Sequence, residues 1–283
     1  MSQVIACIDG SATTVAVCDY SAWAAMQLNA PLLLLHVLDD KRYPAATDLS
    51  GNIGLGSREQ LLDELAALDE QRAKLALQQG HGMLESAKAR ALEDGVATVQ
   101  MRQRHGDLNE SLQDLESDTR LVVLGLHGED SSTNPQLIGS HVETVIRTAH
   151  RPLLLTPDAY KKPRSAMIAY DGSATTQKGV QMVAQSPLFK GMPVHVVMVD
   201  ADTVDNREKL TWAEKLLNSH GHEVVTALRA GEVEPTLHGY QTEQDIDVLV
   251  MGAYGHSRLR QFLVGSTTTA MLQTSTRPVL VLR

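Results

Sequence analysis

The sequence predicts an α/β protein built from two tandem domains, each an open, parallel, five-stranded sheet with helices on both faces. Two observations favour this fold class. The segment 6–14 returns in almost the same form at 168–176, and the segment 139–155 is matched in the same way by 265–281. Short runs of valine, isoleucine and leucine alternate with longer helical patterns, which is typical of parallel strands buried on both faces. A repeat this long exceeds any solenoid unit and indicates two whole domains.

Five apolar runs of strand length occur in each half. In the first half they are residues 4–8, 32–38, 96–102, 121–124 and 152–155. In the second half they are residues 166–170, 194–199, 223–228, 248–251 and 279–282. Helical patterns lie between the runs, so each half is predicted to alternate β and α units.

The two halves meet at residues 157–164, which are bracketed by prolines and lack apolar periodicity, as linkers do. We therefore expect a first domain at residues 1–157 and a second at residues 165–283. The last runs of the two halves are apolar and would be sheet edges, and an uncovered apolar edge invites pairing.

An insertion at about residues 41–82 makes the first domain the longer one. In it a glycine-rich loop precedes a helix whose leucines, from Leu61 to Leu68, form one stripe. Gly80 and Gly82 are expected to break or bend this helix. The stripe could cover the first domain or form a further interface, and the sequence leaves both open.

Composition and charge exclude several classes of function. The chain of 283 residues carries a formal charge of -9, so neither a nucleic acid nor an anionic membrane surface is expected as a partner. It has two cysteines, Cys7 and Cys18, which provide no disulfide framework. Met1 leads directly into the first apolar run without a signal-peptide pattern, and no run reaches membrane-spanning length. These features predict a protein of the reducing cytoplasm.

The most specific motif follows the predicted strand 248–251 and ends at the start of a predicted helix. Its glycines allow positive φ and close backbone approach, and a Gly-Ser pair at a helix N-terminus presents free amides to an anion. In open parallel sheets, ligands collect at this end of the strands. His256 and Arg258 lie in the spacer of the motif. The motif consists of Gly252, Gly255, a nine-residue spacer, Gly265, Ser266 and Thr267.

This arrangement resembles the nucleotide-binding motif of the universal stress protein family, in which Gly-x2-Gly-x9-Gly is followed by Ser or Thr. The likeness covers the whole chain as two copies, including Asp-Gly-Ser after the first strand of each half and Arg-Pro before the last. It implies an adenine-nucleotide alpha-hydrolase-like fold, ATP with Mg²⁺ as cofactor, and a role in stress survival. It also implies pairing of the two last strands within the chain, which would make an intramolecular pseudo-dimer with a further homodimer left open.

The same resemblance assigns roles to residues of the second half. Asp171 and Gly172 would lie near the ribose and phosphates, and backbone groups around Val199 would read the adenine edge. Ribose and phosphates would be held by Gly252, Gly255, Gly265, Ser266 and Thr267, with His256 and Arg258 beside them.

The first half departs from the pattern in spacing and in charge. Ten residues, not nine, separate Gly128 from Gly139, and Glu129 and Asp130 replace His256 and Ser257. A unit charge about 4 Å from a phosphate contributes roughly 4 kcal/mol in a half-wet site. We therefore predict one competent ATP site in the second half and one degenerate site in the first. The degenerate site would comprise Asp9, Val37, Gly125, Gly128, Gly139 and Ser140.

Simpler roles compete with these assignments. Ser11 and Ser173 are expected to cap the helices that follow them, with Asp9 and Asp171 stabilising the turns. Arg258 could lie in a loop surrounded by solvent. His220 and His222 have metal-ligand spacing, but no nearby cysteine or carboxylate set completes a site, so no metal centre is expected.

The sequence thus predicts a cytoplasmic ATP-binding stress-response sensor or regulator, with the nucleotide held mainly by the second domain. One alternative is a nucleotide-free scaffold in which the glycines only form turns. The other is a slow ATP-hydrolysing enzyme that uses the first-domain cleft for a small ligand. No catalytic trio is evident and the Gly-Lys-Ser or Gly-Lys-Thr ending of a P-loop is absent, so fast hydrolysis is not expected.

Overall fold

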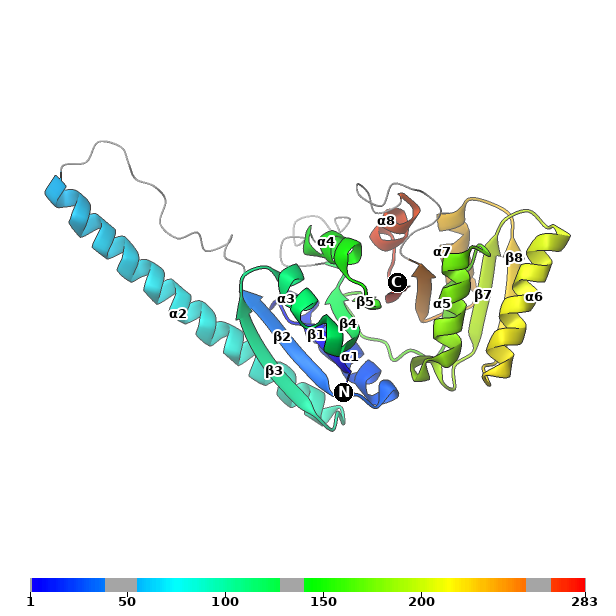
Figure 1. Ribbon diagram of the computed structural model, residues 1–283, viewed down its shortest axis with the longest axis horizontal. Helices are drawn as coiled ribbons and strands as arrows, with labels where there is room; N and C mark the ends of the chain where they lie inside the picture. The colour runs from blue at the N-terminus through cyan, green and yellow to red at the C-terminus, as the bar shows by residue number, and fades with distance from the viewer. Residues whose placement is uncertain (1, 39–54, 128–139, 253–265, 283) are drawn as a thin grey trace.

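The computed structural model describes residues 2–38, 55–127, 140–252 and 266–282 of the chain (Figure 1). The strands are β1 (Gln3–Cys7), β2 (Leu32–Leu38), β3 (Val99–His105), β4 (Thr119–Gly125), β5 (Leu153–Thr156), β6 (Ala166–Ala169), β7 (Val194–Val199), β8 (Val224–Arg229), β9 (Val248–Gly252) and β10 (Val279–Leu282). The α-helices are α1 (Thr14–Leu28), α2 (Leu55–Glu93), α3 (Leu108–Asp114), α4 (Ser140–Thr148), α5 (Ala174–Gln185), α6 (Val204–Ser219), α7 (Val233–Glu243) and α8 (Ser266–Gln273). Two short 3-10 helices, η1 (Glu116–Asp118) and η3 (Pro187–Phe189), complete the described elements.

The strands of the two halves form one sheet of ten strands in the order β3-β2-β1-β4-β5-β10-β9-β6-β7-β8. Neighbouring strands within each half are parallel, as the sequence predicts. At the centre β10 pairs antiparallel with β5, with Leu280 opposite Leu154. The two five-stranded sheets are therefore continuous, and neither last strand is an edge.

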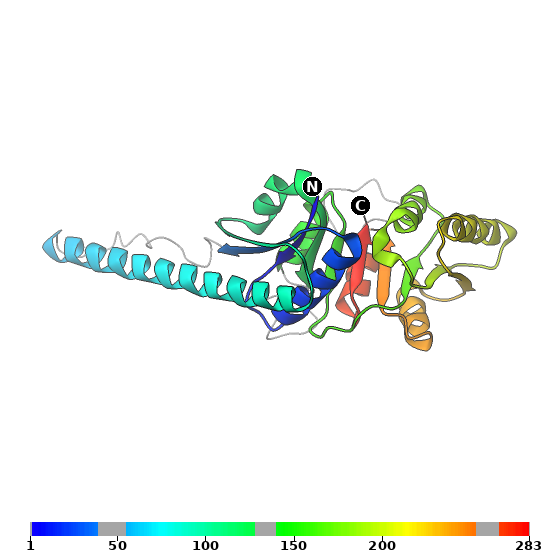
Figure 2. The same ribbon diagram turned by 90° about the horizontal axis from the view of Figure 1, so that it is seen from below.

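Successive side chains along each strand point to opposite faces of the sheet, so the apolar residues form two cores, one on each face. Val4 and Ala6 of β1 belong to the core covered by α1, α2, α5 and α6. Ile5 and Cys7 belong to the core under α3, α4, α7 and α8. Both faces of the sheet are thus covered by helices, as Figure 2 shows from below. This explains why central strands such as β2 are almost entirely apolar, whereas the outer strand β3 is rich in polar residues.

The third strand of the first half starts later than predicted. Val96 was expected to begin it, but β3 runs from Val99 to His105. The Val96 amide donates to the Ala91 carbonyl, 3.1 Å away, and Gly95 has a φ of 99°. Val96 is buried because it closes the end of α2, so its apolar character marks a helix C-terminus and not a strand.

Gly80 and Gly82 do not break the insertion helix, so this expectation was wrong. The helix α2 is continuous from Leu55 to Glu93. At Gly80 the helix passes so close to the sheet that a Cβ atom there would lie 2.6 Å from Cδ2 of His36 and would also meet Gln103. Gly80 is therefore required by close packing, and a single glycine in a long packed helix is tolerated despite its propensity cost.

The N-terminal part of α2 extends beyond the sheet, as Figures 1 and 2 both show. Leu84, Ala87 and Ala91, near its C-terminus, are buried in the core. Leu68 and Leu75 instead remain 51% and 57% exposed. The leucine stripe therefore does not cover the first half over its described residues.

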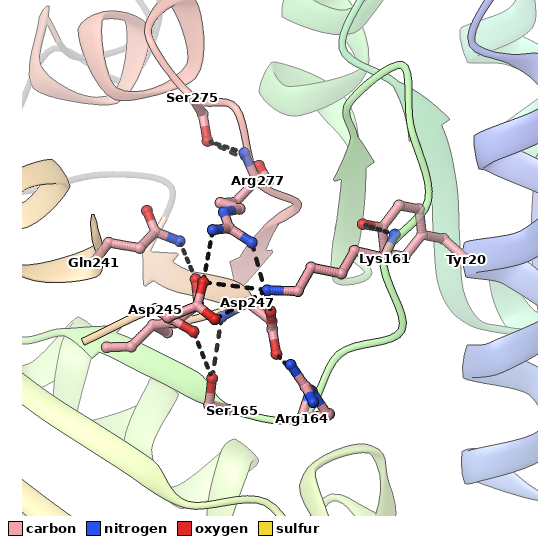
Figure 3. A network of polar contacts seen from close by, with 10 residues as sticks. Tyr20, Lys161, Arg164, Ser165, Gln241, Asp245, Asp247, Ser275 and Arg277 are labelled. Atoms are coloured by element: carbon pink, nitrogen blue, oxygen red, sulfur yellow. Dashed lines mark hydrogen bonds and ion pairs between the residues drawn. The ribbon is translucent and has the colours of Figure 1, made fainter. Parts of the chain in front are cut away.

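The segment that joins the halves is held against β9 and β10 by a network of ion pairs and hydrogen bonds (Figure 3). Asp247, whose side chain is 3% exposed, lies at its centre. Lys161 Nζ is 2.7 Å from Asp247 Oδ1, an ion pair whose angles do not suit a hydrogen bond. The Arg164 amide donates to Asp247 Oδ2 at 2.9 Å, and Arg277 contributes a second cation. The linker is thus an ordered part of the junction.

Candidate functional site

Four of the residues predicted to bind the nucleotide lie at the carboxyl ends of neighbouring strands in the second half. Asp171 and Gly172 follow β6, Val199 ends β7 and Gly252 ends β9. In the sheet β6 lies between β7 and β9, so these residues come from three adjacent strand ends. This is the edge at which open parallel sheets bind ligands.

The turn after β6 is built as the simpler interpretation predicts. Ser173 is the N-cap of α5 and accepts a hydrogen bond from the Thr176 amide, 3.3 Å away. Asp171 Oδ1 accepts from the Ser173 amide at 2.9 Å and from Thr176 Oγ1 at 2.7 Å. Gly172 has a φ of 75°, a value that favours glycine. Asp171 therefore has a structural role in this turn, while its side chain remains exposed at the strand edge.

Sequence reasoning missed a cation at this edge, Lys209 of α6. Its side chain crosses over Gly172 so closely that a Cβ atom on the glycine would lie 2.5 Å from Lys209 Cδ. The lysine Nζ pairs with Asp205 at 2.6 Å. This hydrogen bond chiefly raises the pKa of Lys209, and the nearby carboxylates of Asp200 and Asp171 add to the effect.

Packing between α6 and the end of β6 explains the position of Lys209. The rings of Tyr170 and Trp212 are stacked with their centroids 6.5 Å apart. This pair holds α6 beside the turn at Gly172. In the sequence Lys209 belongs to an ordinary amphipathic helix, so only its distance from Gly172 distinguishes it from other surface lysines.

The corresponding turn of the first half is built differently, and the predicted capping role of Ser11 was wrong. The N-cap of α1 is Thr13, without a capping side-chain hydrogen bond. Ser11 Oγ instead donates to Asp9 Oδ1 at 2.7 Å. Asp9 also accepts from the Ser11 amide and from Thr14 Oγ1.

A hydroxyl group links this turn to the end of β4. Thr13 Oγ1 donates to the His127 backbone oxygen at 3.1 Å and lies 2.8 Å from Ser11 Oγ. Gly125 makes room for this contact, because a Cβ atom there would lie 3.0 Å from Thr13 Cβ. The second-half counterpart of Thr13 is Thr175, whose methyl carbon would only touch a Cβ at Gly252, 3.4 Å away. Thr13 therefore ties the two strand ends of the first half together, whereas Tyr254, the second-half equivalent of His127, lies outside the described residues.

The group that covers the turn glycine also differs between the halves. Met83 of α2 lies over Gly10, where Lys209 lies over Gly172. A Cβ atom on Gly10 would lie 2.6 Å from Met83 Sδ. The first-half turn is thus covered by an uncharged thioether and the second-half turn by a cation. Val37, which was predicted to belong to the degenerate site of the first half, is a half-buried residue of β2.

The remaining predicted residues fall on the two phosphate-loop segments. Gly255, His256, Arg258 and Gly265 of the second half lie outside the described residues, as do Gly128 and Gly139 of the first. Ser266 and Thr267 begin α8, and Ser140 begins α4. A helix thus starts directly after each predicted phosphate loop, as anion binding at a helix N-terminus requires.

Two further findings concern metals and membranes. Within the described ranges, no group of three or more histidine, cysteine, aspartate or glutamate side chains could hold a metal ion. His222 is buried with Nε2 3.3 Å from the Ala184 oxygen, whereas His220 is exposed and contacts the Leu216 oxygen. No helix in the described part of the chain is both long and apolar enough to cross a membrane.

Comparison with known proteins gives a consistent result over the whole chain. The model of the universal stress protein family matches twice, at residues 1–157 and 163–283. The chain is 36% identical over 287 residues to a universal stress protein of Synechocystis sp., with 100% of each protein covered. A solved universal stress protein from Archaeoglobus fulgidus has a TM-score of 0.72 at 17% identity, covering 99% of this chain and 98% of that one. A Pseudomonas aeruginosa structure, described as a putative universal stress protein, has a TM-score of 0.62 at 15% identity, covering 100% and 93%.

Proposed function

We propose that this chain, which belongs to the universal stress protein family, binds ATP mainly in its second half and acts as a sensor or regulator in the stress response. The nucleotide would lie across the ends of β6, β7 and β9. Asp171 and Gly172 would contact ribose and phosphates, and the backbone at Val199 would contact the adenine. Gly252, Gly255, Gly265, Ser266 and Thr267 would hold ribose and phosphates, with His256 and Arg258 beside them.

The observation that carries this proposal is the position of Lys209. Its ammonium group pairs with Asp205 and lies 3.5 Å from the Asn206 side-chain oxygen, both on its own helix. Lys209 lies over Gly172 at a strand end, and its present partner Asp205 is an exposed carboxylate. Its ammonium group can therefore leave Asp205 and pair with a phosphate bound at this edge. Lysine acts in phosphate sites as a mobile point charge.

The same comparison argues against an equivalent site in the first half. There Met83 replaces the lysine over the turn glycine. The first-half loop also has Glu129 and Asp130 at positions that hold His256 and Ser257 in the second half. Both differences disfavour a polyphosphate, so we propose a single ATP site for each chain.

Retained nucleotide gives the most direct test. Purified protein is denatured by heat, and the supernatant is analysed by mass spectrometry for adenine nucleotides. Titration calorimetry with ATP and Mg²⁺ then measures affinity in the stripped protein. If the protein retains no nucleotide and also binds none in the titration, the proposal is contradicted and a scaffold is favoured. Release of ADP that depends on a third compound would favour an enzyme.

Matched substitutions test which half binds. Gly265→Val should abolish ATP binding, because a side chain would block the approach of the backbone to phosphate. Gly139→Val, at the equivalent point of the first half, should leave the ATP affinity unchanged. If both variants bind like wild type, or if Gly139→Val has the larger effect, the assignment of the site is wrong.

We further propose that the antiparallel β5–β10 pairing is the interface of an intramolecular pseudo-dimer, because it joins equivalent strands of the two repeats. Joining both repeats in one chain gives them an effective concentration of about millimolar order, which favours pairing within the chain. Nucleotide bound to the second half would then lie in a domain that shares the β5–β10 interface with the first half.

A further inference from the structure

A second cavity lies at the junction of the two halves, and none of its lining residues belongs to the candidate nucleotide site. It has a volume of about 340 Å³. Its apolar lining includes Met182, Leu188, Phe189 and Leu280, and two arginines, Arg120 and Arg151, also line it. Apolar walls with a few polar groups are typical of small-molecule sites, which occur preferentially between domains.

We call this cavity the open groove. The sequence repeat relates it to an equivalent place at the junction, which is filled by protein side chains. Each half carries a helix residue, a residue at the beginning of the fourth strand and an arginine before proline at matching distances from the repeated motifs. The matching pairs are Met182 and Tyr20, Arg120 and Asp247, and Arg151 and Arg277. The open groove is therefore the counterpart of the place where the linker is held.

The linker fills that counterpart with its own side chains. The rings of Tyr20 and Tyr160 meet edge to face, with centroids 4.8 Å apart. The Lys161 amide donates to the Tyr20 hydroxyl at 3.3 Å, and Lys161 Nζ reaches Asp247 (Figure 3). One linker joins the halves and can fill only one of two equivalent places, so the Met182 side stays open.

The side-chain charge at one equivalent position is opposite in the open groove and in the place where the linker is held. Where the linker lies, Asp247 receives cations, but Arg120 takes the equivalent position in the open groove. Arg120 Nη1 donates to the Leu28 oxygen and Arg151 Nε to the Glu116 oxygen, both at 3.1 Å. In the described part of the chain neither arginine has an ion pair with a carboxylate. Each keeps guanidinium N–H donors that can bind an anion.

We propose that the open groove binds a small amphiphilic carboxylate. Its apolar body would pack against Met182, Leu188 and Phe189, where the linker places Tyr160 in the equivalent site. Its carboxylate would accept hydrogen bonds from Arg120 and Arg151, because planar guanidinium groups match carboxylate geometry. The cavity volume lies at the lower end of the range of about 300–1,000 Å³ usual for ligand pockets, which suits a compact molecule.

Decanoate, used below its micelle concentration, is the probe for this site. Calorimetry on the full chain should show saturable binding of one decanoate, about 15-fold tighter than octanoate, because each buried methylene adds about fourfold. Decan-1-ol should bind at least about tenfold more weakly, since it lacks the charge that the arginines pair with. Saturating ATP should leave decanoate binding unchanged, so this site is tested separately from the proposed nucleotide site.

Two variants locate the site. Arg120→Gln combined with Arg151→Gln should weaken decanoate binding at least about tenfold, whereas Arg102→Gln on the outer strand β3 should have no effect. Met182→Tyr should fill the groove as Tyr20 and the linker fill its counterpart, and should abolish binding while the protein still unfolds cooperatively. The proposal is overturned if decanoate does not saturate, if it is displaced by ATP, or if Met182→Tyr and the double arginine variant bind it like wild type.

Discussion

Lys209 and Met83 lie over equivalent glycines, Gly172 and Gly10, yet only the lysine can pair with a phosphate. A hydrogen bond to a charged group contributes about 1.5–3 kcal/mol. Lys209→Met, which gives the second half the residue found in the first, should therefore weaken ATP binding by about tenfold or more. Titration calorimetry measures the change.

Lys215 provides the control for this substitution, because it lies on the same helix and is exposed away from the turn. Lys215→Met removes the same charge and should leave ATP affinity within about twofold of wild type, since the field of a distant exposed charge is screened by salt. Equal loss of affinity in both variants would mean that only net charge matters and that Lys209 does not contact the ligand.

His195 is a buried histidine of β7 whose Nδ1 lies 2.9 Å from the Tyr240 hydroxyl. Burial lowers the pKa of His195 from its usual 6.5. Between that lowered value and 6.5 the unfolded chain binds more protons than the folded chain, so stability falls as pH falls. Above pH 6.5 both states hold this side chain neutral, and the effect of His195 on the pH dependence disappears.

The expected outcome is a slope in the free energy of unfolding against pH that becomes flatter below pH 6.5 in His195→Gln than in wild type. Urea unfolding at a series of pH values from 8 to 5 measures it. His220→Gln is the control, because His220 is exposed. If the wild-type and His195→Gln slopes are parallel, His195 does not titrate differently in the two states.

At the scale of an element, α2 carries two glycines whose surroundings are opposite. A Cβ atom on Gly82 would have nothing within 4 Å, while one on Gly80 would meet the side chains of His36 and Gln103. Gly82→Ala should therefore stabilise the protein by about 0.5–1 kcal/mol through helix propensity alone. Gly80→Ala should lose this gain or destabilise, because β2 and β3 must move.

Thermal or urea unfolding of the two single variants measures the difference. The same substitution is made in the same helix, two positions apart, so propensity cancels in the comparison. A stabilising effect of Gly80→Ala as large as that of Gly82→Ala would show that the helix does not press against the sheet at this point.

The sequence predicts which elements form better than where they end. Each of the ten strands overlaps a predicted run, and the prediction is best for the central strands, because a strand covered on both faces is apolar. The continuity of α2 could not be predicted from the sequence. Gly80 suggests a break, but it is required by close contact with His36 of β2, which is far away in the sequence. Val96 was misplaced for a related reason, since a buried helix end and a buried strand start look alike.

At the scale of the whole molecule, repetition predicts two parallel sheets of the same fold. It does not predict Lys209 and Met83 as the side chains that lie over the two turn glycines. Lys209 is ordinary in the sequence of α6, and Met83 is ordinary in the sequence of α2. Their positions over Gly172 and Gly10 depend on packing across the fold, which no local sequence pattern contains.

Asp247 holds the junction together, because it contacts both the linker and the segment ahead of β10. Its side chain is 3% exposed, and it receives Lys161 and Arg164 of the linker and Arg277 ahead of β10. Asp247→Ala removes the buried acceptor of the network and leaves Lys161 and Arg277 paired with the exposed Asp245. We expect the free energy of unfolding to fall by about 2–3 kcal/mol and the melting temperature to fall by about 3–5 °C.

The matched control is the exposed pair of Arg104 and Asp114, which are 2.8 Å apart in the first half. Asp114→Ala should cost less than about 1 kcal/mol, because exposed ion pairs are screened by water and salt. Calorimetric scans of both variants beside wild type separate the two cases. A drop for Asp247→Ala no larger than that for Asp114→Ala would mean that the strand pairing of β5 with β10 holds the halves together without help from the linker network.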